Sequence, residues 1–187
     1  MSATTTTPSK PNPSITTPPS TPINLTVLGT GAWGTALAQL AEVNGHNIQM
    51  WARRGELSLK DAITSADVIL SAISMKGVAS LAQQLKAISL SPETILITAT
   101  KGLDPDTTQT PSQIFTAAFP NNAVAVLSGP NLSKEIEAGL PAATVLASTD
   151  LAAAETAQRL LSSEKFRVYT STDPLGAELG GTLNYVM

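Results

Sequence analysis

Three glycines at fixed spacing are the residues of this sequence with the clearest capacity for chemistry. Gly29, Gly31 and Gly34 form a G-x-G-x-x-G pattern between the aliphatic run Asn24–Leu28 and the helical run Thr35–Leu40. In such a loop the first glycine permits a tight turn, the second lets the backbone approach a pyrophosphate, and the third lets the helix pack on the strand. The pattern therefore predicts a dinucleotide-binding loop with phosphates at the start of the helix. A glycine-rich turn without a ligand is the alternative.

The residues after the next predicted strand bear on which dinucleotide binds. Arg53 and Arg54 follow Ile48–Trp51, and no acidic residue occurs until Glu56. An NAD site usually places Asp or Glu there to hold the ribose hydroxyls, whereas the planar guanidinium of arginine suits the 2′-phosphate of NADP. The sequence thus favours NADP(H), with NAD(H) as the alternative. Two solvated loop arginines would carry no such preference.

Two later loops carry residues that could bind an anionic substrate. Lys101 follows the predicted strand Thr94–Ala99, and Gly129 and Pro130 follow Val124–Leu127. Ligands of open parallel sheets bind outside the carboxyl ends of the strands, so both loops are expected at one edge. A lysine and a glycine-led helix start together predict a cationic pocket for a phosphorylated or anionic substrate. A surface lysine and an ordinary turn are the alternatives.

Short aliphatic runs alternate with Ala-rich helical patterns from Ile23 onward. This alternation predicts an α/β fold of the Rossmann type, doubly wound around a mainly parallel sheet. The predicted strands are Asn24–Leu28, Ile48–Trp51, Val68–Ile73, Thr94–Ala99, Val124–Leu127, Thr144–Ala147 and Phe166–Tyr169. The predicted helices are Gly34–Asn44, Ser58–Thr64, Val78–Ile88, Ser112–Phe119, Leu132–Ala138, Leu151–Ser162 and one that starts near Leu175.

The bulk composition restricts the class of protein. The chain of 187 residues is 42% hydrophobic and can form one domain plus the beginning of a second. A net charge of −3 without a run of Lys or Arg argues against nucleic-acid binding. The lack of cysteine and the single histidine, His46, argue against a metal site. No apolar run has the length of a membrane span, and we expect a cytoplasmic protein.

The sequence divides into three predicted parts. Residues 1–22 are almost entirely Thr, Pro, Ser and Asn, a composition that predicts a disordered tail, with an organelle transit peptide as the alternative. Residues 23–173 contain all the strand patterns and are predicted to form the Rossmann domain. Residues 174–187 are predicted to form the first helix of a further, helical domain.

Five short motifs follow one another along the chain. They are GTGAWGTALA (Gly29–Ala38), ATKGL (Ala99–Leu103), SGPNLSKEI (Ser128–Ile136), GLPAA (Gly139–Ala143) and ELGGTL (Glu178–Leu183). With them the chain resembles the bacterial-type NAD(P)-dependent glycerol-3-phosphate dehydrogenases, in the short form typical of cyanobacteria. The resemblance implies reversible hydride transfer between NAD(P)H and dihydroxyacetone phosphate, giving sn-glycerol 3-phosphate for phospholipid synthesis. Another dehydrogenase of the β-hydroxyacid type with the same Rossmann half is the alternative.

The resemblance also implies roles for individual residues. Beside the three glycines, those implied to contact the dinucleotide are Ala32, Trp33, Arg53, Arg54, Lys101 and Ser133. Those implied to contact the substrate are Lys101, Gly129 and Asn131. For Trp33, packing on the protein core is an equal alternative.

The end of the sequence departs from the family pattern. Family members continue as an all-helical domain, and their ELGGALKN motif contains a lysine thought to transfer a proton. Asn184 stands at the position of that lysine. An amide does not exchange a proton near neutral pH, so Lys101 or water would have to do so, with a rate lower by roughly 10²–10⁴. We therefore expect a truncated dehydrogenase with little turnover; the alternative is an NADP(H)-binding module without turnover, such as a sensor, a partner subunit or a decayed gene product.

A helix that lacks its packing partner exposes its apolar side chains. In the last predicted helix, Leu179, Leu183 and Val186 would form an apolar stripe. Such a stripe predicts self-association through this helix.

Overall fold

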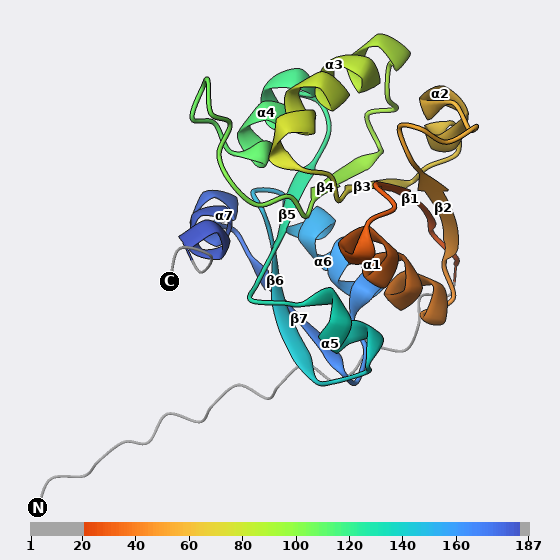
Figure 1. Cartoon of the computed structure of the whole chain (residues 1–187), viewed down its shortest axis with the longest axis vertical. Helices are drawn as coiled ribbons and strands as arrows, with labels where there is room; N and C mark the ends of the chain where they lie inside the picture. Colours follow the sequence, from red (N-terminus) through yellow and green to blue (C-terminus); the bar gives the residue numbers. More distant parts are fainter. Residues whose placement is uncertain (1–20, 184–187) are drawn as a thin grey trace, which may run out of the picture.

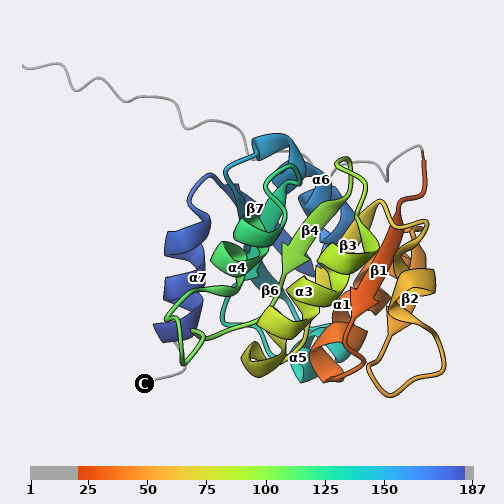
Figure 2. The same cartoon turned by 90° about the horizontal axis from the view of Figure 1, so that it is seen from above.

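The computed structural model describes residues 21–183, with Leu183 placed by its backbone alone. Within this range, seven strands form one sheet with helices on both faces, as Figure 1 and Figure 2 show. This arrangement confirms the predicted α/β fold of the doubly wound Rossmann type. The predicted tail up to residue 20, and Asn184 and Val186 at the other end, lie outside the described residues.

The sheet is parallel except at one pair of strands. Its strands are β1 (Asn24–Leu28), β2 (Asn47–Trp51), β3 (Val68–Ser71), β4 (Ile95–Thr98), β5 (Val124–Ser128), β6 (Ala142–Ser148) and β7 (Phe166–Ser171). Their order is β2-β1-β3-β4-β5-β6-β7, and only β6 runs antiparallel to its neighbour β5. Because β2 and β3 flank β1, the strand order reverses beside β1, and such a reversal is where ligands bind in open α/β sheets.

Two sets of helices cover the two faces. The helices are α1 (Ala32–Val43), α2 (Leu59–Ile63), α3 (Val78–Ile88), α4 (Pro111–Ala118), α5 (Ser133–Glu137), α6 (Leu151–Leu161) and α7 (Pro174–Leu183), with a short 3₁₀ turn at Met75–Gly77. Helices α1, α5 and α6 pack on one face, and α2, α3 and α4 on the other. Helix α7 packs on β5 and β6. No helix within residues 21–183 has the length and apolar character needed to cross a bilayer.

Alternating side chains of the central strands fill the two hydrophobic layers. Leu25 and Val27 of β1 are buried against Leu37 of α1 and its neighbours. Thr26, between them, points to the opposite face, where its hydroxyl donates a hydrogen bond to the Ala62 carbonyl of α2 at 2.7 Å. This period of two, read from the sequence, therefore fixes which face of β1 meets which helix.

The predicted elements are all present, with shifts at their ends. Strand β1 and helix α3 have the predicted bounds. Strand β3 ends at Ser71 instead of Ile73, and Ala72, the residue that follows it, lies against the glycine loop. Helix α1 begins at Ala32 instead of Gly34. The second half of the glycine motif therefore belongs to the helix.

Candidate functional site

The glycine loop joins β1 to α1 under tight steric limits. Gly29 has φ +120°, and a Cβ there would lie 2.7 Å from the carbonyl oxygen of Ala72. A Cβ on Gly34 would overlap the carbonyl oxygen of Gly29. The Gly29 N–H donates to the carbonyl of Trp51 at 2.9 Å, which joins the loop to the end of β2. Both positions therefore exclude any side chain, as expected for the first and last glycines of the motif.

The middle glycine faces open space. Gly31 is exposed, and a Cβ added to it would meet no atom within 4 Å. It is the N-cap of α1, and neither it nor the first turn of that helix carries an acidic residue. Unpaired N–H groups at the start of a twelve-residue helix attract an anion. The loop thus fits the pyrophosphate of a dinucleotide, with Ala32, also exposed, beside it.

The turn after β2 places two cations beside this loop. Arg53 and Arg54 are both exposed, and within residues 21–183 neither guanidinium makes a hydrogen bond or an ion pair. The turn folds back on β2, where the indole N–H of Trp51 donates to the Leu57 carbonyl at 3.0 Å. The structure therefore leaves both arginines accessible to a ligand at the carboxyl end of β2.

Trp33 lies in the first turn of α1. It is partly buried and packs against the hydrophobic layer on the α1 face. The packing role considered from the sequence is therefore present, and contact with a cofactor stays a prediction.

Lys101 lies just beyond β4 and is held close to β3 and β5. The hydroxyl of Thr100 donates to the Ile73 carbonyl at 2.9 Å. The Lys101 Nζ donates to the Gly129 carbonyl at 3.0 Å. Burial lowers the pKa of the Lys101 amine, because desolvation disfavours its charged form. The structure thus joins the two loops that the sequence predicted to share one edge.

Gly129 and Asn131 form a compact corner after β5. A Cβ on Gly129 would lie 2.7 Å from Nδ2 of Asn131 and 3.1 Å from the Thr144 hydroxyl. Asn131 is only 8% exposed, and its Nδ2 has no hydrogen-bond partner among the described residues. A buried amide without a partner is costly, so this donor is suited to an acceptor on a ligand. Ser133, partly buried, begins α5, which contacts α1.

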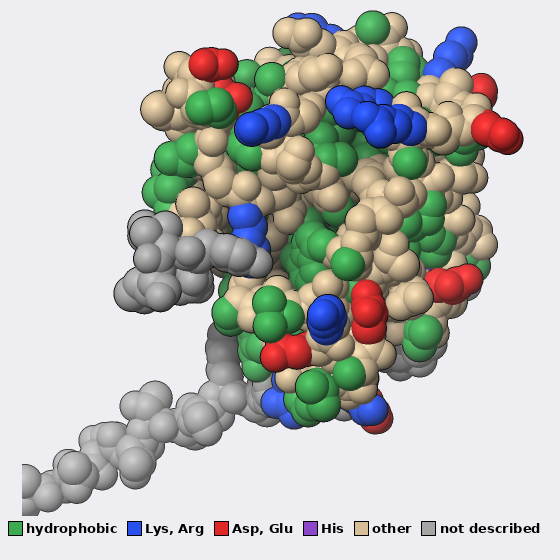
Figure 3. All heavy atoms as spheres, viewed as in Figure 1, with side chains coloured by type: hydrophobic (Ala, Val, Ile, Leu, Met, Phe, Trp, Pro, Cys, Tyr) green, Lys and Arg blue, Asp and Glu red, His purple; other side chains and the backbone are tan. Residues whose placement is uncertain are grey.

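The carboxyl ends of the parallel strands face the viewer in Figure 3, which has the view of Figure 1. A hydrophobic area occupies the middle of this face, and separate Lys and Arg side chains lie around it together with Asp and Glu side chains. No group of acidic or histidine side chains able to hold a metal ion occurs among residues 21–183. The face therefore combines an apolar centre with charged surroundings.

Helix α7 holds residues that the sequence did not identify. Glu178 is 5% exposed, and its carboxylate accepts hydrogen bonds from the backbone N–H of Ser112 at 2.9 Å and from the Ser112 hydroxyl at 2.5 Å. The negative charge meets the first turn of α4, where it is stabilised. The only signal in the sequence was the motif ELGGTL, which names no partner for Glu178.

The apolar side of α7 is partly visible. Leu175 and Leu179 are 44% and 38% exposed. Leu179 belongs to the predicted stripe; its other members, the Leu183 side chain and Val186, lie outside the described residues. Self-association through this helix stays a prediction.

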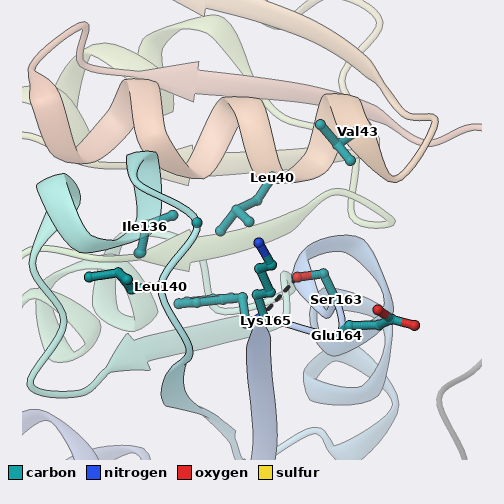
Figure 4. A pocket seen from close by; sticks show the side chains of 9 residues that line it. Leu40, Val43, Ile136, Leu140, Ser163, Glu164 and Lys165 are labelled. Carbon is teal, nitrogen blue, oxygen red and sulfur yellow. Dashed lines mark hydrogen bonds between the residues drawn. The ribbon is translucent and has the colours of Figure 1, made fainter.

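An apolar groove lies apart from these loops. It encloses about 350 Å³ between the end of α1, the segment after α5 and the start of β7. Figure 4 shows Leu40, Ile136 and Leu140 lining it together with Lys165. None of the predicted site residues lines this groove. It therefore does not form part of the dinucleotide loop or of the corner at Asn131.

Comparisons with known proteins identify the family of this chain. The family described as NAD-dependent glycerol-3-phosphate dehydrogenase N-terminus matches residues 24–59 and 55–154. Glycerol-3-phosphate dehydrogenase (NAD(P)+) of Synechocystis sp. (strain ATCC 27184 / PCC 6803 / Kazusa) is 58% identical over 167 residues, which are 89% of this chain and 53% of that protein. The enzyme of the same name from Trichormus variabilis is 58% identical over 161 residues, covering 86% and 52%. The chain thus spans about half the length of the curated relatives it matches.

Solved structures support the fold. Glycerol-3-phosphate dehydrogenase from Coxiella burnetii superposes with a TM-score of 0.79 at 24% identity, covering 86% of this chain and 57% of that one. The Plasmodium falciparum enzyme gives a TM-score of 0.80 at 17% identity, covering 88% and 57%. Both chains share the Rossmann architecture described above.

Proposed function

The chain belongs to the NAD-dependent glycerol-3-phosphate dehydrogenase family, and we propose that it provides the dinucleotide-binding half of such an enzyme together with part of its substrate pocket. The reaction is reversible hydride transfer between NAD(P)H and dihydroxyacetone phosphate, with sn-glycerol 3-phosphate as the product that serves phospholipid synthesis. A cytoplasmic location is part of this proposal.

One observation carries the proposal. The glycine loop and the corner of Lys101, Gly129 and Asn131 occupy the same edge of the sheet, linked through the end of β3. Ala72 contacts Gly29 on one side of that end, and the next residue along the chain accepts the Thr100 hydrogen bond on the other. A dinucleotide and a small anion bound at these two places would be neighbours, as hydride transfer requires.

The dinucleotide would rest on the open backbone at Gly31 and Ala32, with Gly29 and Gly34 keeping β1 and α1 close together. Ser133 would lie against it from α5. When bound, the nicotinamide ring supplies or accepts the hydride.

Lys101 and Asn131 would handle the substrate. The ammonium of Lys101 attracts its phosphate or its carbonyl oxygen, and the Nδ2 of Asn131 donates a hydrogen bond to one of its oxygens. The lowered pKa of Lys101 suits its Nζ to give a proton to the carbonyl oxygen as that oxygen gains charge. Gly129 keeps this corner free of a side chain that would displace Asn131.

The finer choice of cofactor is NADP(H). Its 2′-phosphate would lie near the carboxyl end of β2, where the accessible guanidinium groups of Arg53 and Arg54 can each form charge-assisted hydrogen bonds. An acidic residue that would hold the hydroxyls of NAD is absent from positions 52–55.

A second function has one observation in its favour. Asn184 replaces the lysine that family members are thought to use in proton transfer. A chain that binds NADP(H) without turnover, as a sensor or partner subunit, fits that replacement. The two functions differ in turnover and agree in nucleotide binding.

The test is a titration of the purified chain with NADPH and with NADH, followed by energy transfer from Trp33 and Trp51. Dihydroxyacetone phosphate is then added and nucleotide oxidation is recorded. The variant Gly31→Ala should weaken nucleotide binding while the matched variant Gly180→Ala leaves it unchanged, because both glycines face open space but only Gly31 lies at the loop.

NADPH binding with turnover supports the enzyme, and binding without turnover supports the second function. Failure to bind either nucleotide would overturn both.

A further inference from the structure

Helix α7 contacts the segment that follows β4. The hydroxyl of Thr182 donates to the Glu178 carbonyl one turn earlier at 2.9 Å and accepts a hydrogen bond from the Gly102 N–H at 3.3 Å. Gly102 has φ +106°, a conformation that favours glycine, and directly follows Lys101. A displacement of the Gly102 amide therefore moves the Lys101 backbone with it.

The same helix contacts the end of β5. The Ser128 hydroxyl donates to the Ala177 carbonyl at 2.6 Å. Gly181 faces Ser128 so closely that a Cβ on it would overlap the Ser128 hydroxyl oxygen. Since Ser128 immediately precedes Gly129, α7 is fixed to the strand end that presents the carbonyl acceptor of Lys101.

A third contact fixes the far end of the segment that begins at Lys101. That segment runs to the N-cap of α4 at Thr110, and the buried Glu178 carboxylate binds both the N–H and the hydroxyl of Ser112. Helix α7 therefore holds the segment from Lys101 to the start of α4 at both ends, through Thr182 at its start and through Glu178 at its end. The hydrogen bonds span 80 and 66 residues of sequence.

We propose that α7 is the positioning element of the substrate site, and that Thr182 is a positioning residue whose hydroxyl fixes Gly102 and thereby keeps Nζ of Lys101 at the Gly129 carbonyl. This inference rests on the proposed function, because it assigns Lys101 to the substrate. Thr182 itself does not contact substrate; it acts through the backbone next to Lys101.

The experiment compares three variants of the whole chain. Thr182→Val removes the hydroxyl and keeps the shape, while Thr182→Ser keeps the hydroxyl. Thr156→Val is the matched control. The Thr156 hydroxyl, partly buried on α6, also donates to a carbonyl one turn earlier at 2.9 Å and also accepts a hydrogen bond, in this case from Arg159. The ligand is dihydroxyacetone phosphate in the presence of NADP+, a pair that cannot react.

Two readouts are recorded. One is the affinity for dihydroxyacetone phosphate beside that for NADPH. The other is the titration of the Lys101 side-chain carbons by carbon-13 NMR, with the signal assigned by its loss in Lys101→Arg.

Thr182→Val should lower the affinity for dihydroxyacetone phosphate about 3- to 10-fold, the loss expected for one hydrogen bond. It should also raise the pKa of Lys101 toward its ordinary value, because the amine becomes more hydrated. NADPH affinity should not change. Thr182→Ser should restore both readouts, and Thr156→Val should alter neither.

The inference is overturned if Thr182→Val matches the wild type in the Lys101 titration, if Thr182→Ser behaves like Thr182→Val, or if Thr156→Val has the same effect. A wild-type chain that binds NADPH but no dihydroxyacetone phosphate overturns the substrate half of the proposed function. The Lys101 titration still decides the positioning role in that case.

Discussion

The two sides of the site are held in different ways. On the dinucleotide side, Gly29 and Gly34 are fixed by backbone atoms that leave no room for a Cβ. On the substrate side, Lys101 donates to the Gly129 carbonyl. The segment that begins at Lys101 is held by hydrogen bonds from Gly102 to Thr182 and from Ser112 to Glu178, two side chains of the last described helix. A site fixed by steric exclusion is disrupted by a larger side chain. The hydrogen bonds of Thr182 and Glu178, called the clamp below, are disrupted by the loss of a single polar atom. Substitutions should therefore separate the two sides.

The largest effect is expected from Gly34→Ala. The added Cβ would overlap the Gly29 carbonyl oxygen, and the helix must shift away from β1. We expect the free energy of unfolding to fall by about 3 kcal/mol, as for severe overpacking, and NADPH binding to be lost. Denaturant unfolding and nucleotide titration measure both, with Gly180→Ala as the control. Unchanged stability would contradict the conclusion that steric exclusion fixes the dinucleotide side.

Lys101→Met tests the opposite side. Loss of a hydrogen bond made by a charged group corresponds to roughly 10- to 100-fold in affinity. We expect a loss of this size for dihydroxyacetone phosphate with NADP+ present and a smaller loss for NADPH, measured by calorimetry. Lys86→Met, on the exposed surface of α3, should change neither affinity. Equal losses for both ligands would show that the two sides are not separable.

Glu178→Gln tests the clamp through stability. A glutamine has one acceptor oxygen where the carboxylate has two, so it cannot accept the Ser112 N–H and hydroxyl bonds in the same geometry, and the charge at the first turn of α4 is lost. We expect the free energy of unfolding to fall by about 1–2 kcal/mol. Glu155→Gln, exposed on α6, should stay within about 0.5 kcal/mol of the wild type. The clamp is contradicted if the two variants unfold alike.

Arg53 and Arg54 are expected to distinguish NADPH from NADH on the dinucleotide side. Replacing both Arg53 and Arg54 with Ala should lower NADPH affinity about 10-fold and leave NADH affinity unchanged, because only NADPH carries the 2′-phosphate. Arg167→Ala, at an exposed position of β7, is the control. A parallel loss for both nucleotides would mean that the arginines contact the shared part of the dinucleotide.

The smallest expected effect is a pH dependence of stability that arises from His46, which contacts the backbone just before β1. His46 is buried and its Nδ1 accepts the Ile23 N–H at 3.2 Å, and burial lowers the pKa of this histidine below 6.5. The unfolded chain therefore binds a proton that the folded chain does not, so stability is full above about pH 6.5 and declines as the pH falls from there to the folded pKa.

Urea unfolding between pH 5 and pH 8 measures this effect. His46→Gln retains an acceptor for Ile23 and should remove the pH dependence that His46 contributes. A wild-type protein whose stability does not decline below pH 6.5 would contradict the lowered pKa.

The sequence predicted the fold and the dinucleotide side because both depend on local patterns. Period-two strands, Ala-rich helices and the glycine spacing each lie within a short stretch, and Lys101 and Asn131 could be placed by the rule that ligands bind at the carboxyl ends of strands. The last residue of β3 and the start of α1 could not be predicted, since both lie at the contacts around Gly29.

The contacts of the clamp, made by Glu178 and Thr182, could not be predicted from the sequence for a different reason. Glu178 and Thr182 read as ordinary residues of an amphipathic helix, and their partners Ser112 and Gly102 lie far away along the chain. Only the packing of α7 on β5 and β6 brings them together. A motif can mark such a helix, but it carries no information on which loop each side chain meets.

The position of α7 along the chain sets an order of assembly during synthesis. The contacts described for the glycine loop all lie within residues 24–73, whereas Thr182 emerges from the ribosome 80 residues after its partner Gly102. Because chains generally fold from the N-terminus as they are made, the nascent protein completes its nucleotide loop long before Lys101 is fixed. A nucleotide that binds this early intermediate stabilises it by mass action, and so acts as a folding ligand before it serves as a coenzyme.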